Sequence, residues 1–335
     1  MLSHRKYLNR FKTVLNFLSN RNIFQAYPPE VGIELTDHCN LECTMCPHGV
    51  MDRPKGFMEV DFFKKIVDEI REFSEFIFLH GIGESLLHTN LVECINYAGE
   101  KGLTTALSTN ICYLDEKLGR DILESNLNFI TLALDGGTKE TYESIRVKGD
   151  FNQVLSNIKQ FLRLKNETRS KVDVTLQLIL MRNNWHESKL FENLFSEEEK
   201  KAVNHFRFKP FWDNFVRSDH SIQHDRACFY LWNMMSIFWD GQVPLCCVDY
   251  DNQWNLGDLK KHSVKEIWNS AWVKKARDSH SKSKLSDYSI CDTCSVPNQE
   301  YFSPFNVFAS AFLGSKRIRK ILPIYEKYFI KKPFN

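Results

Sequence analysis

The stretch GIELTDHCNLECTMC, residues 32 to 46, joins a short apolar run to three cysteines spaced four and then three residues apart. The apolar run has the length and composition of a buried β-strand. Closely spaced cysteines in a reducing compartment are typical metal ligands. The sequence therefore predicts that Cys39, Cys43 and Cys46 form a metal site directly after a first strand.

Two kinds of metal site are compatible with these cysteines. A structural zinc ion takes four ligands, and the neighbouring His38 and His48 keep that possibility open. An iron–sulfur cluster held by three cysteines instead leaves one iron without a protein ligand, much as a catalytic zinc keeps an open position. Such an iron can bind a substrate or a cofactor.

Short apolar runs recur along the first two thirds of the chain. Helix-like stretches such as 59–73 and 90–102 separate them, with apolar residues at steps of three and four. Repeated strand–helix units predict parallel strands with right-handed crossovers, and six units are too few for a complete eight-stranded barrel. The predicted fold class is α/β, a partial (β/α)6 TIM-like barrel with its chemistry at the carboxyl ends of the strands. The six runs are GIELTD (32–37), FIFLHGIG (76–83), TTALSTN (104–110), NFITLALDG (128–136), VDVTLQLILM (172–181) and HFRFKPFW (205–212).

The composition fits one large globular domain, or one domain with an appendage. The chain has 335 residues, of which 43% are hydrophobic and 26% are charged. It contains no uninterrupted apolar run of about 18 residues and no N-terminal export signal. These features predict a cytoplasmic protein.

Basic residues concentrate at the two ends. Residues 1–22 carry a net charge of +5 and residues 312–335 one of +6, against +2 for the whole chain, so the body between them is acidic. Interleaved apolar and basic residues are typical of helices that lie on an anionic membrane or against an acidic partner. A helix packed on the body with a solvated basic face is the commoner alternative. We therefore expect packed terminal helices, with peripheral membrane contact as the second interpretation.

The ten cysteines are not scattered evenly. Secreted disulfide scaffolds are usually short, so clustered cysteines in this chain favour metal binding over disulfides. Cys94 and Cys112 are expected to be core thiols. The remaining cysteines form a front group of Cys39, Cys43 and Cys46 and a rear group of Cys228, Cys246 or Cys247, Cys291 and Cys294.

The C-x3-C-x2-C spacing of CNLECTMC resembles that of the radical S-adenosylmethionine (radical SAM) enzymes, and the resemblance extends from about residue 31 to residue 213. HGIGESLL (80–87) resembles the family's glycine-glycine-glutamate segment, which holds the methionine ammonium of S-adenosylmethionine (AdoMet). Gly81, Gly83 and Glu84 match that segment, whereas Ser85 stands where proline is common.

Two further stretches, ALSTN (106–110) and LALDGGTKETYESIR (132–146), resemble the third and fourth strand ends of the family. The likeness implies that Ser108 and Asn110 contact the cofactor and that Arg146 meets its methionine carboxylate.

Two positions depart from the family pattern. Ala133 replaces a serine that is frequent in this strand, and Met45 stands where an aromatic residue often packs on adenine. A flexible thioether can fill the same space less rigidly.

The resemblance accounts for three cysteines without a fourth. It implies a 4Fe-4S cluster whose open iron binds AdoMet, and one electron, from a donor such as flavodoxin or ferredoxin, then cleaves the sulfonium bond. The 5′-deoxyadenosyl radical that forms abstracts hydrogen from an unactivated carbon.

The rear cysteines lie in segments that resemble the C-terminal extension called SPASM, in its short "twitch" form. That form implies a second 4Fe-4S cluster held by Cys228, Cys246, Cys291 and Cys294, although zinc fits the ligand set on geometry alone. Cys247 is either the ligand in place of Cys246 or a spare thiol, and spacing favours Cys246 as the ligand.

Four regions follow from these interpretations. They are a basic amphipathic segment (1–30), the radical SAM core (31–215), the SPASM/twitch domain (216–300) and a basic helical tail (301–335).

The expected reaction is oxidation of an alcohol to a ketone, because a fully ligated second cluster can accept an electron. One single-cluster relative, an aminocyclitol dehydrogenase, works in this way. Lys209, Arg207 and Asp213 are candidates for the base, and Cys247 can donate a hydrogen atom if the enzyme is an epimerase. Residues 1–30 are too short for a leader-peptide domain, which favours a small-molecule or carbohydrate substrate over a peptide.

A non-enzyme alternative stays open at this point. Zinc knuckles with basic ends would suit a nucleic-acid-binding protein. The acidic body and the cofactor-like strand ends argue against it, so we expect no nucleic-acid partner.

Overall fold

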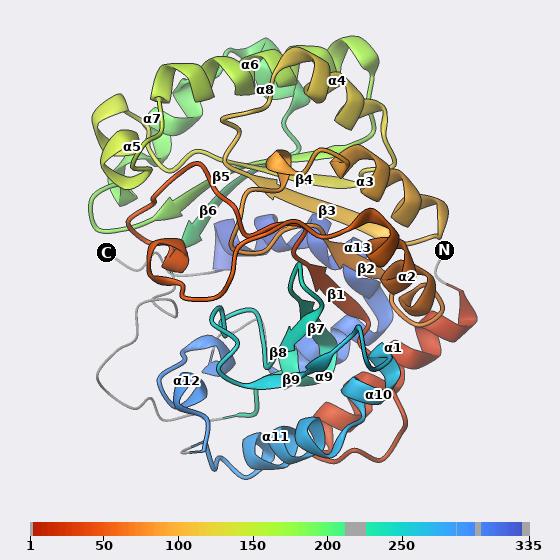
Figure 1. Ribbon diagram of the computed structural model, residues 1–335. Helices are drawn as coiled ribbons and strands as arrows, with labels where there is room; N and C mark the ends of the chain where they lie inside the picture. The colour runs from red at the N-terminus through yellow and green to blue at the C-terminus, as the bar shows by residue number, and fades with distance from the viewer. Residues whose placement is uncertain (1–2, 212–225, 286, 299–302, 330–335) are drawn as a thin grey trace.

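A sheet of seven parallel strands forms the centre of the computed structural model, which describes residues 3–211, 226–285, 287–298 and 303–329 (Figure 1). The strand order is β6-β5-β4-β3-β2-β1-β7, so consecutive strands from β1 to β6 are neighbours. The strands are β1 (Glu30–Ile33), β2 (Phe76–Phe78), β3 (Thr104–Thr109), β4 (Phe129–Ala133), β5 (Asp173–Leu180), β6 (His205–Pro210) and β7 (Met234–Ile237).

The six predicted strands are confirmed in order, with helices in the connections between them, and the sheet has the form of a partial barrel. The seventh strand was not anticipated. β7 comes from the cysteine-rich C-terminal region and pairs in parallel with β1, Gly32 lying opposite Ser236. Its four residues sit between a short helix and a turn, so no repeating pattern marked them as part of the sheet.

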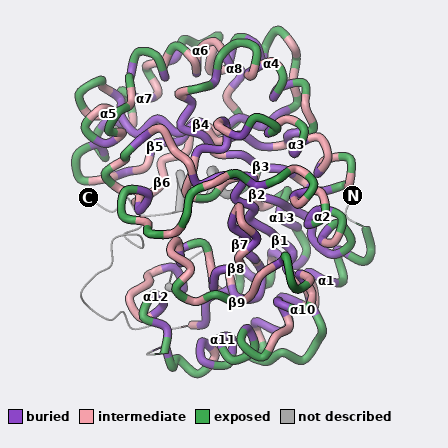
Figure 2. The backbone as a smooth tube through the Cα atoms, in the orientation of Figure 1, coloured by how far each residue is buried: buried purple, intermediate pink, exposed green. Residues whose placement is uncertain are grey.

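Helices cover the outer face of the sheet (Figure 1). Their apolar faces meet strand residues such as Ile77, Leu107 and Ile130 in the main core, which appears in Figure 2 as buried backbone along the strands. The covering helices are α2 (Val60–Ile70), α3 (Leu91–Glu100), α4 (Glu116–Glu124), α5 (Lys139–Ile145), α6 (Phe151–Thr168), α7 (Ser188–Asn193) and α8 (Glu197–Ala202). Short 3-10 turns lie at η1 (Pro47–Val50), η2 (Ser85–Leu87) and η3 (Trp185–Glu187).

The inner face of the sheet has its own apolar cluster. Phe76, Phe78, Ala106 and Phe129 pack together, with Met234 of β7 against them. Side chains alternate between the two faces of a strand, so these residues point away from the outer helices. The strands near the middle of the sheet are therefore buried on both faces, as in other parallel sheets.

The C-terminal region forms a smaller unit below the sheet in Figure 1. Its core combines Phe229, Trp232 and Ile290 with Val14 and Phe17 from the N-terminal helix. Its elements are α9 (Tyr230–Asn233), the antiparallel pair β8 (Gln242–Pro244) and β9 (Asn255–Asp258), α10 (Val264–Trp268), α11 (Ala271–Ser281), α12 (Ser289–Asp292) and η4 (Val296–Asn298).

The two basic ends are helices that pack against each other: α1 (His4–Leu18) and α13 (Pro304–Phe329), which bends at Gly314. The side chain of Arg10 is buried between them and pairs with Glu75 and Glu30, while Ser315 accepts a hydrogen bond from the same guanidinium. These ion pairs and hydrogen bonds hold α1 and α13 against the start of β1 and the residue before β2. One face of each terminal helix therefore packs against the protein, as the first interpretation expects. Membrane contact by these helices stays a prediction.

Within the described part of the chain, no helix is both long and apolar enough to cross a membrane.

We predict that Arg10→Met lowers the free energy of unfolding by about 3–5 kcal/mol, because it leaves Glu75 buried without its counter-charge. Urea unfolding of the anaerobic protein, followed by tryptophan fluorescence, measures the loss. The matched control is Arg5→Met, whose partner Glu72 lies on the surface, and it should cost less than about 1 kcal/mol. Equal losses for the two variants would contradict the assigned role of Arg10.

Candidate active site

The loop that carries the three front cysteines leaves the carboxyl end of β1 and is held by the segment after α5. The backbone N–H of Glu42 donates to the carbonyl of Val147 at 3.0 Å, and that of Thr44 donates to Ile145 at 2.9 Å. These bonds fix the loop between Cys39 and Cys46 against a segment that follows β4. The position of the cysteine loop thus depends both on β1, which it follows, and on the segment after α5.

Glu84 joins the loops that follow β1, β2 and β3. Its N–H donates to the carbonyl of His38 at 2.8 Å, and its carboxylate accepts from the N–H groups of Asn110 at 2.7 Å and Leu86 at 3.0 Å. Burial raises the pKa of this carboxyl, and the two N–H groups act in the opposite direction. A carboxylate has about four acceptor positions. Glu84 can therefore fasten the loops and still accept a hydrogen bond from an ammonium.

Gly81 and Gly83 allow the β2 loop to approach the β1 loop closely. A Cβ on Gly83 would lie 2.3 Å from the carbonyl oxygen of Thr36 and 2.6 Å from the Cα of Asp37, and one on Gly81 would lie 2.6 Å from Oε2 of Glu34. Only glycine fits where backbone meets backbone at such distances.

Polar side chains approach two of the three front cysteines. Nδ2 of Asn110 lies 3.8 Å from Sγ of Cys39, and Nη1 of Arg146 lies 3.6 Å from Sγ of Cys43. The buried Asp135 holds Arg146 in place, with 2.8 Å between Nε and Oδ2. Hydrogen-bond donors near the sulfur atoms tune the reduction potential of an iron–sulfur cluster.

The chemistry of this donor set fits an iron–sulfur cluster. Burial raises the pKa of the Cys39 thiol to about 11 and also raises the pKa values of Cys43 and Cys46. Thiolates in such surroundings need nearby positive charge, and bound metal supplies it. No three His, Cys, Asp or Glu side chains within the described ranges meet closely enough to hold a single metal ion.

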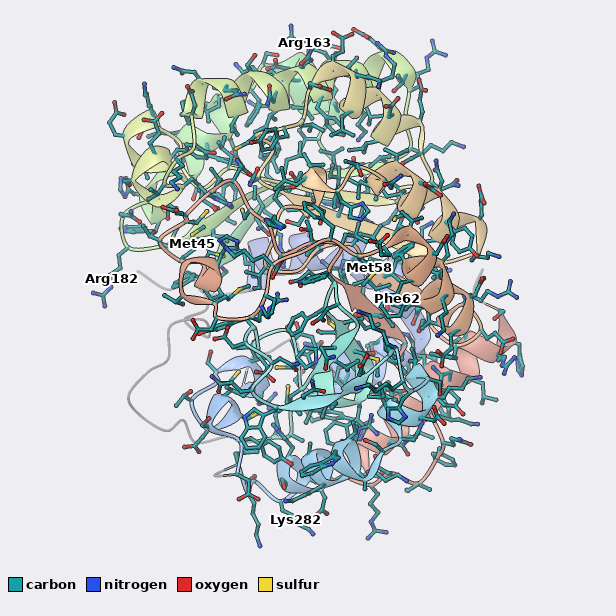
Figure 3. The ribbon with its side chains drawn as sticks, viewed as in Figure 1. Met45, Met58, Phe62, Arg163, Arg182 and Lys282 are labelled. Carbon is teal, nitrogen blue, oxygen red and sulfur yellow. The ribbon has the colours of Figure 1, made fainter. Side chains whose placement is uncertain are left out.

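The other predicted cofactor residues lie around the same edge of the sheet. Met45 occupies the tight turn between Cys43 and Cys46, and Figure 3 labels its position on the cysteine loop. Ser108 lies near the end of β3, opposite Thr131 of β4. Their contacts with AdoMet, like those of Gly81, Gly83, Glu84, Asn110 and Arg146, stay predictions.

Sequence reasoning missed a buried charge network below the cysteine loop. Arg53 pairs with Glu34 at 2.6 Å and with Asp37 at 3.4 Å, donates to the carbonyl of Tyr250 at 2.7 Å and lies over the ring of Phe238. It thereby joins the barrel to the C-terminal unit. Its partners lie up to about 200 residues away, so no local motif could reveal it. Asp135 was missed for a related reason. In the sequence, its place just after a strand was the only sign of a functional role.

The rear cysteines meet around a cavity in the C-terminal unit. Cys228, Cys246, Cys291 and Cys294 all line it, together with apolar residues such as Leu245. Cys247 is not among the lining residues. Burial and mutual proximity raise the pKa values of the Cys246 and Cys291 thiols, so this donor set also fits a group that brings positive charge.

Cys247 follows Cys246 directly in the chain but does not line that cavity. Its residue is exposed, and desolvation by the surrounding protein, together with the nearby Cys294, raises the pKa of its thiol to about 11. The charge of Lys209 acts on this thiol and also on His80, whose pKa is lowered to about 4 by burial and by Arg319 and Lys209. Lys209 is therefore near enough to both His80 and Cys247 for its charge to act on each of them.

The remaining base candidates are placed differently. Arg207 lies on β6 with Nη1 3.4 Å from Oε1 of Gln177. Asp213 lies outside the described residues, as does the predicted boundary at residues 215 and 216.

Two family models match the chain. The radical SAM superfamily model matches residues 33–193, and the SPASM model of an iron–sulfur cluster-binding domain matches residues 228–295. The chain therefore belongs to the radical SAM superfamily and carries a C-terminal SPASM domain. Membership implies AdoMet and 4Fe-4S clusters as cofactors, and it removes the zinc-binding nucleic-acid protein from consideration.

Curated relatives include enzymes with different printed functions. The chain is 20% identical over 313 residues to the tungsten-containing aldehyde ferredoxin oxidoreductase cofactor-modifying protein of Pyrococcus furiosus, covering 78% of this chain and 87% of that protein. It is 25% identical over 202 residues to the Fe-coproporphyrin III synthase of Methanosarcina barkeri, covering 59% of this chain and 49% of the synthase. The chain thus spans about half the length of that second relative.

Solved structures show the same fold. SuiB of Streptococcus suis bound to its precursor peptide SuiA superimposes with a TM-score of 0.64 at 12% identity, covering 86% of this chain and 75% of SuiB. BtrN in complex with AdoMet and 2-DOIA gives a TM-score of 0.58 at 16% identity, covering 84% of this chain and 99% of BtrN.

We predict that Cys43→Ala abolishes formation of 5′-deoxyadenosine from AdoMet in the reconstituted, dithionite-reduced protein, because the front cluster loses a ligand. Chromatography of the nucleoside measures the effect under anaerobic conditions. Cys94→Ala is the matched control, since Cys94 is buried in α3 away from both cysteine groups, and it should retain cleavage. Retained cleavage in Cys43→Ala would refute the assignment of the front site.

Proposed function

We propose that this enzyme uses AdoMet to abstract a hydrogen atom from an alcohol carbon of a small molecule or carbohydrate, which then becomes a ketone. Cys39, Cys43 and Cys46 would hold the 4Fe-4S cluster that would supply the electron for AdoMet cleavage. Cys228, Cys246, Cys291 and Cys294 would hold a second 4Fe-4S cluster, which would accept an electron. Flavodoxin or ferredoxin remains the proposed electron donor to the AdoMet cluster.

The observation that carries this proposal is the convergence of four rear cysteines on one cavity. Four cysteines complete the ligand set of a 4Fe-4S cluster, so no iron remains open for substrate. Such a cluster is suited to electron transfer. Cys246 rather than Cys247 completes the set, because Cys246 lines the cavity and Cys247 does not.

The proposed substrate position is beside Lys209, whose charge acts on both His80 and Cys247. A guanidinium presents only hydrogen-bond donors, so the role proposed for Arg207 is to orient a substrate oxygen. Lys209 remains the proposed base. His80 is a further candidate that the sequence did not suggest: it is neutral at physiological pH, and its Nδ1 is buried without a hydrogen-bond partner.

Two alternative reactions keep specific support. The exposed Cys247 favours a radical epimerase, in which this thiol returns a hydrogen atom to the substrate carbon. Peptide modification is supported by relatives whose printed names concern precursor peptides or maturation, namely SuiB with SuiA and the mycofactocin maturase MftC of Mycobacterium tuberculosis.

We predict that Cys246→Ala lowers the iron content by about four atoms per chain and blocks ketone formation, while 5′-deoxyadenosine still forms. Iron analysis and product analysis with a panel of candidate alcohols and sugars measure the two effects. Cys94→Ala should change neither.

A different set of results would support the epimerase reaction. In that case Cys246→Ala retains turnover, Cys247→Ala loses it, and the wild-type product made in D2O carries deuterium at the reacting carbon. Unchanged iron content in Cys246→Ala would contradict the assignment of the rear ligands.

Peripheral contact with an anionic membrane remains a proposal for the basic ends. Phe305, Phe308 and Phe312 recur on one face of α13 and are 78%, 47% and 51% exposed. Exposed Lys316 and Arg317 follow the bend, and neither α1 nor residues 304–321 contain an acidic residue. An apolar face beside cations is the pattern of an interfacial helix.

We predict that the protein sediments with vesicles containing phosphatidylglycerol but less with vesicles of phosphatidylcholine alone. Changing Phe305, Phe308 and Phe312 to serine should abolish this sedimentation, because it removes the apolar contact. Trp272→Ser is the control, since Trp272 is an exposed aromatic residue on a different helix, α11. Absence of wild-type sedimentation at low salt would refute membrane contact.

A further inference from the structure

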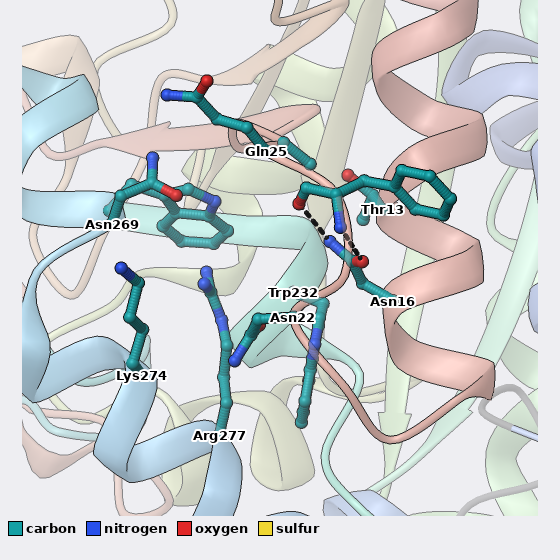
Figure 4. Close-up of a pocket in the computed structure, with 11 residues that line it drawn as sticks. Thr13, Asn16, Asn22, Gln25, Trp232, Asn269, Lys274 and Arg277 are labelled. Carbon is teal, nitrogen blue, oxygen red and sulfur yellow. Dashed lines mark hydrogen bonds between the residues drawn. The ribbon is translucent and has the colours of Figure 1, made fainter.

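A second cavity, of about 260 Å³, lies between α1, the loop at residues 22–26 and the helices α9, α10 and α11 (Figure 4). It shares no lining residue with the cavity of the rear cysteines. None of its lining residues belongs to the proposed AdoMet or substrate site. It is lined by Thr13, Asn16, Asn22, Phe24, Gln25, Ala26, Trp232, Trp268, Asn269, Lys274 and Arg277.

Arg277 is a buried cation that faces this cavity. Its residue is 4% exposed, its Nε donates to the carbonyl of Leu231 at 2.8 Å, and its guanidinium lies 4.5 Å from the ring centre of Trp268. Its Nη2 is buried and has no hydrogen-bond partner. Burial alone lowers the pKa of Arg277 to about 9, with no carboxylate acting in the other direction.

Two more buried donors among the lining residues lack partners. The hydroxyl of Thr13 and the indole N–H of Trp232 are both buried and make no hydrogen bond. Lys274 extends from α11 beside Arg277 toward Asn269, as Figure 4 shows. The lining therefore offers two cations and several neutral donors, and it includes no aspartate or glutamate.

The cavity wall is held in place independently of any ligand. Nδ2 of Asn16 donates to the carbonyl of Phe24 at 2.7 Å, and the N–H of Phe24 donates to Oδ1 of Asn16 at 2.8 Å (Figure 4). This pair fixes the loop at residues 22–26 against α1. The cavity is thus preformed, and its volume of about 260 Å³ lies just below the range of about 300–1,000 Å³ that is usual for drug-sized ligands, which suits a smaller molecule.

A buried guanidinium without a counter-charge is unfavourable, and contact with an aromatic ring offsets only part of that effect. Buried donors normally have acceptors, so three partnerless donors around one cavity indicate an absent acceptor. We infer that this cavity binds the carboxylate or phosphate group of a small anionic molecule. Nη2 of Arg277, Nε1 of Trp232 and Oγ1 of Thr13 donate to its oxygens, and Lys274 adds a second positive charge at its edge.

The inference is tested by calorimetric titration of the anaerobic holoprotein with inorganic phosphate in one arm and with succinate in the other. We expect saturable binding of at least one anion, and the arm that binds tells phosphate from carboxylate. Arg277→Gln should weaken it at least about tenfold, because a charge-assisted hydrogen bond is lost. AdoMet cleavage, measured in the same preparations, should not change.

Lys274→Gln and its neighbour Lys275→Gln form a matched pair that does not disturb the core, because both side chains are exposed and only Lys274 lines the cavity. We expect weaker anion binding in Lys274→Gln and wild-type binding in Lys275→Gln. Trp232→Phe, which keeps the ring and removes the N–H, should also weaken binding. The inference is overturned if neither anion binds, or if Lys274→Gln and Trp232→Phe both bind like the wild type.

Discussion

Backbone contact between two loops is the constraint on which the active site depends. Gly83 lies so close to Thr36 and Asp37 that any side chain there would overlap the main chain of the β1 loop. That contact brings Glu84 under the cysteine loop, where its N–H reaches His38 and its carboxylate reaches Asn110. Three strand ends are thereby joined next to Cys39. A parallel sheet supplies the loops at one edge, and the glycines allow them to close on one another.

The proposed substrate contacts come from both domains. Lys209 of β6 acts electrostatically on His80, which follows β2, and on Cys247 of the SPASM domain. β7 and Arg53 hold these domains together through the sheet and through a buried ion-pair network. The relative position of the two cysteine groups therefore depends on contacts that are neither in the AdoMet motifs nor in the cysteine ligands.

Much of this arrangement could be predicted from the sequence, because the relevant signals are local. The apolar runs of the strands recur along the chain, and the cysteines cluster within short segments. The glycines of HGIGE indicate that another part of the backbone approaches this loop closely. The features that escaped prediction depend on partners far along the chain. They are β7 beside β1, Arg53 paired with Glu34 and bonded to Tyr250, and the cavity that Arg277 and Thr13 both line. A lone arginine in a helix carries no sequence signal of burial. Only the packed structure shows which charges lie inside and which of them lack a counter-charge.

The central claim is that three cysteines leave one iron of the front cluster open to AdoMet. The most direct measurement is electron paramagnetic and electron–nuclear double resonance of the reduced protein, without and with AdoMet labelled with 15N at its amino group and 17O at its carboxylate. The account predicts that AdoMet changes the g values of one cluster signal and that both labels couple to it. A spectrum unaffected by AdoMet, with no coupling to either label, would contradict the account.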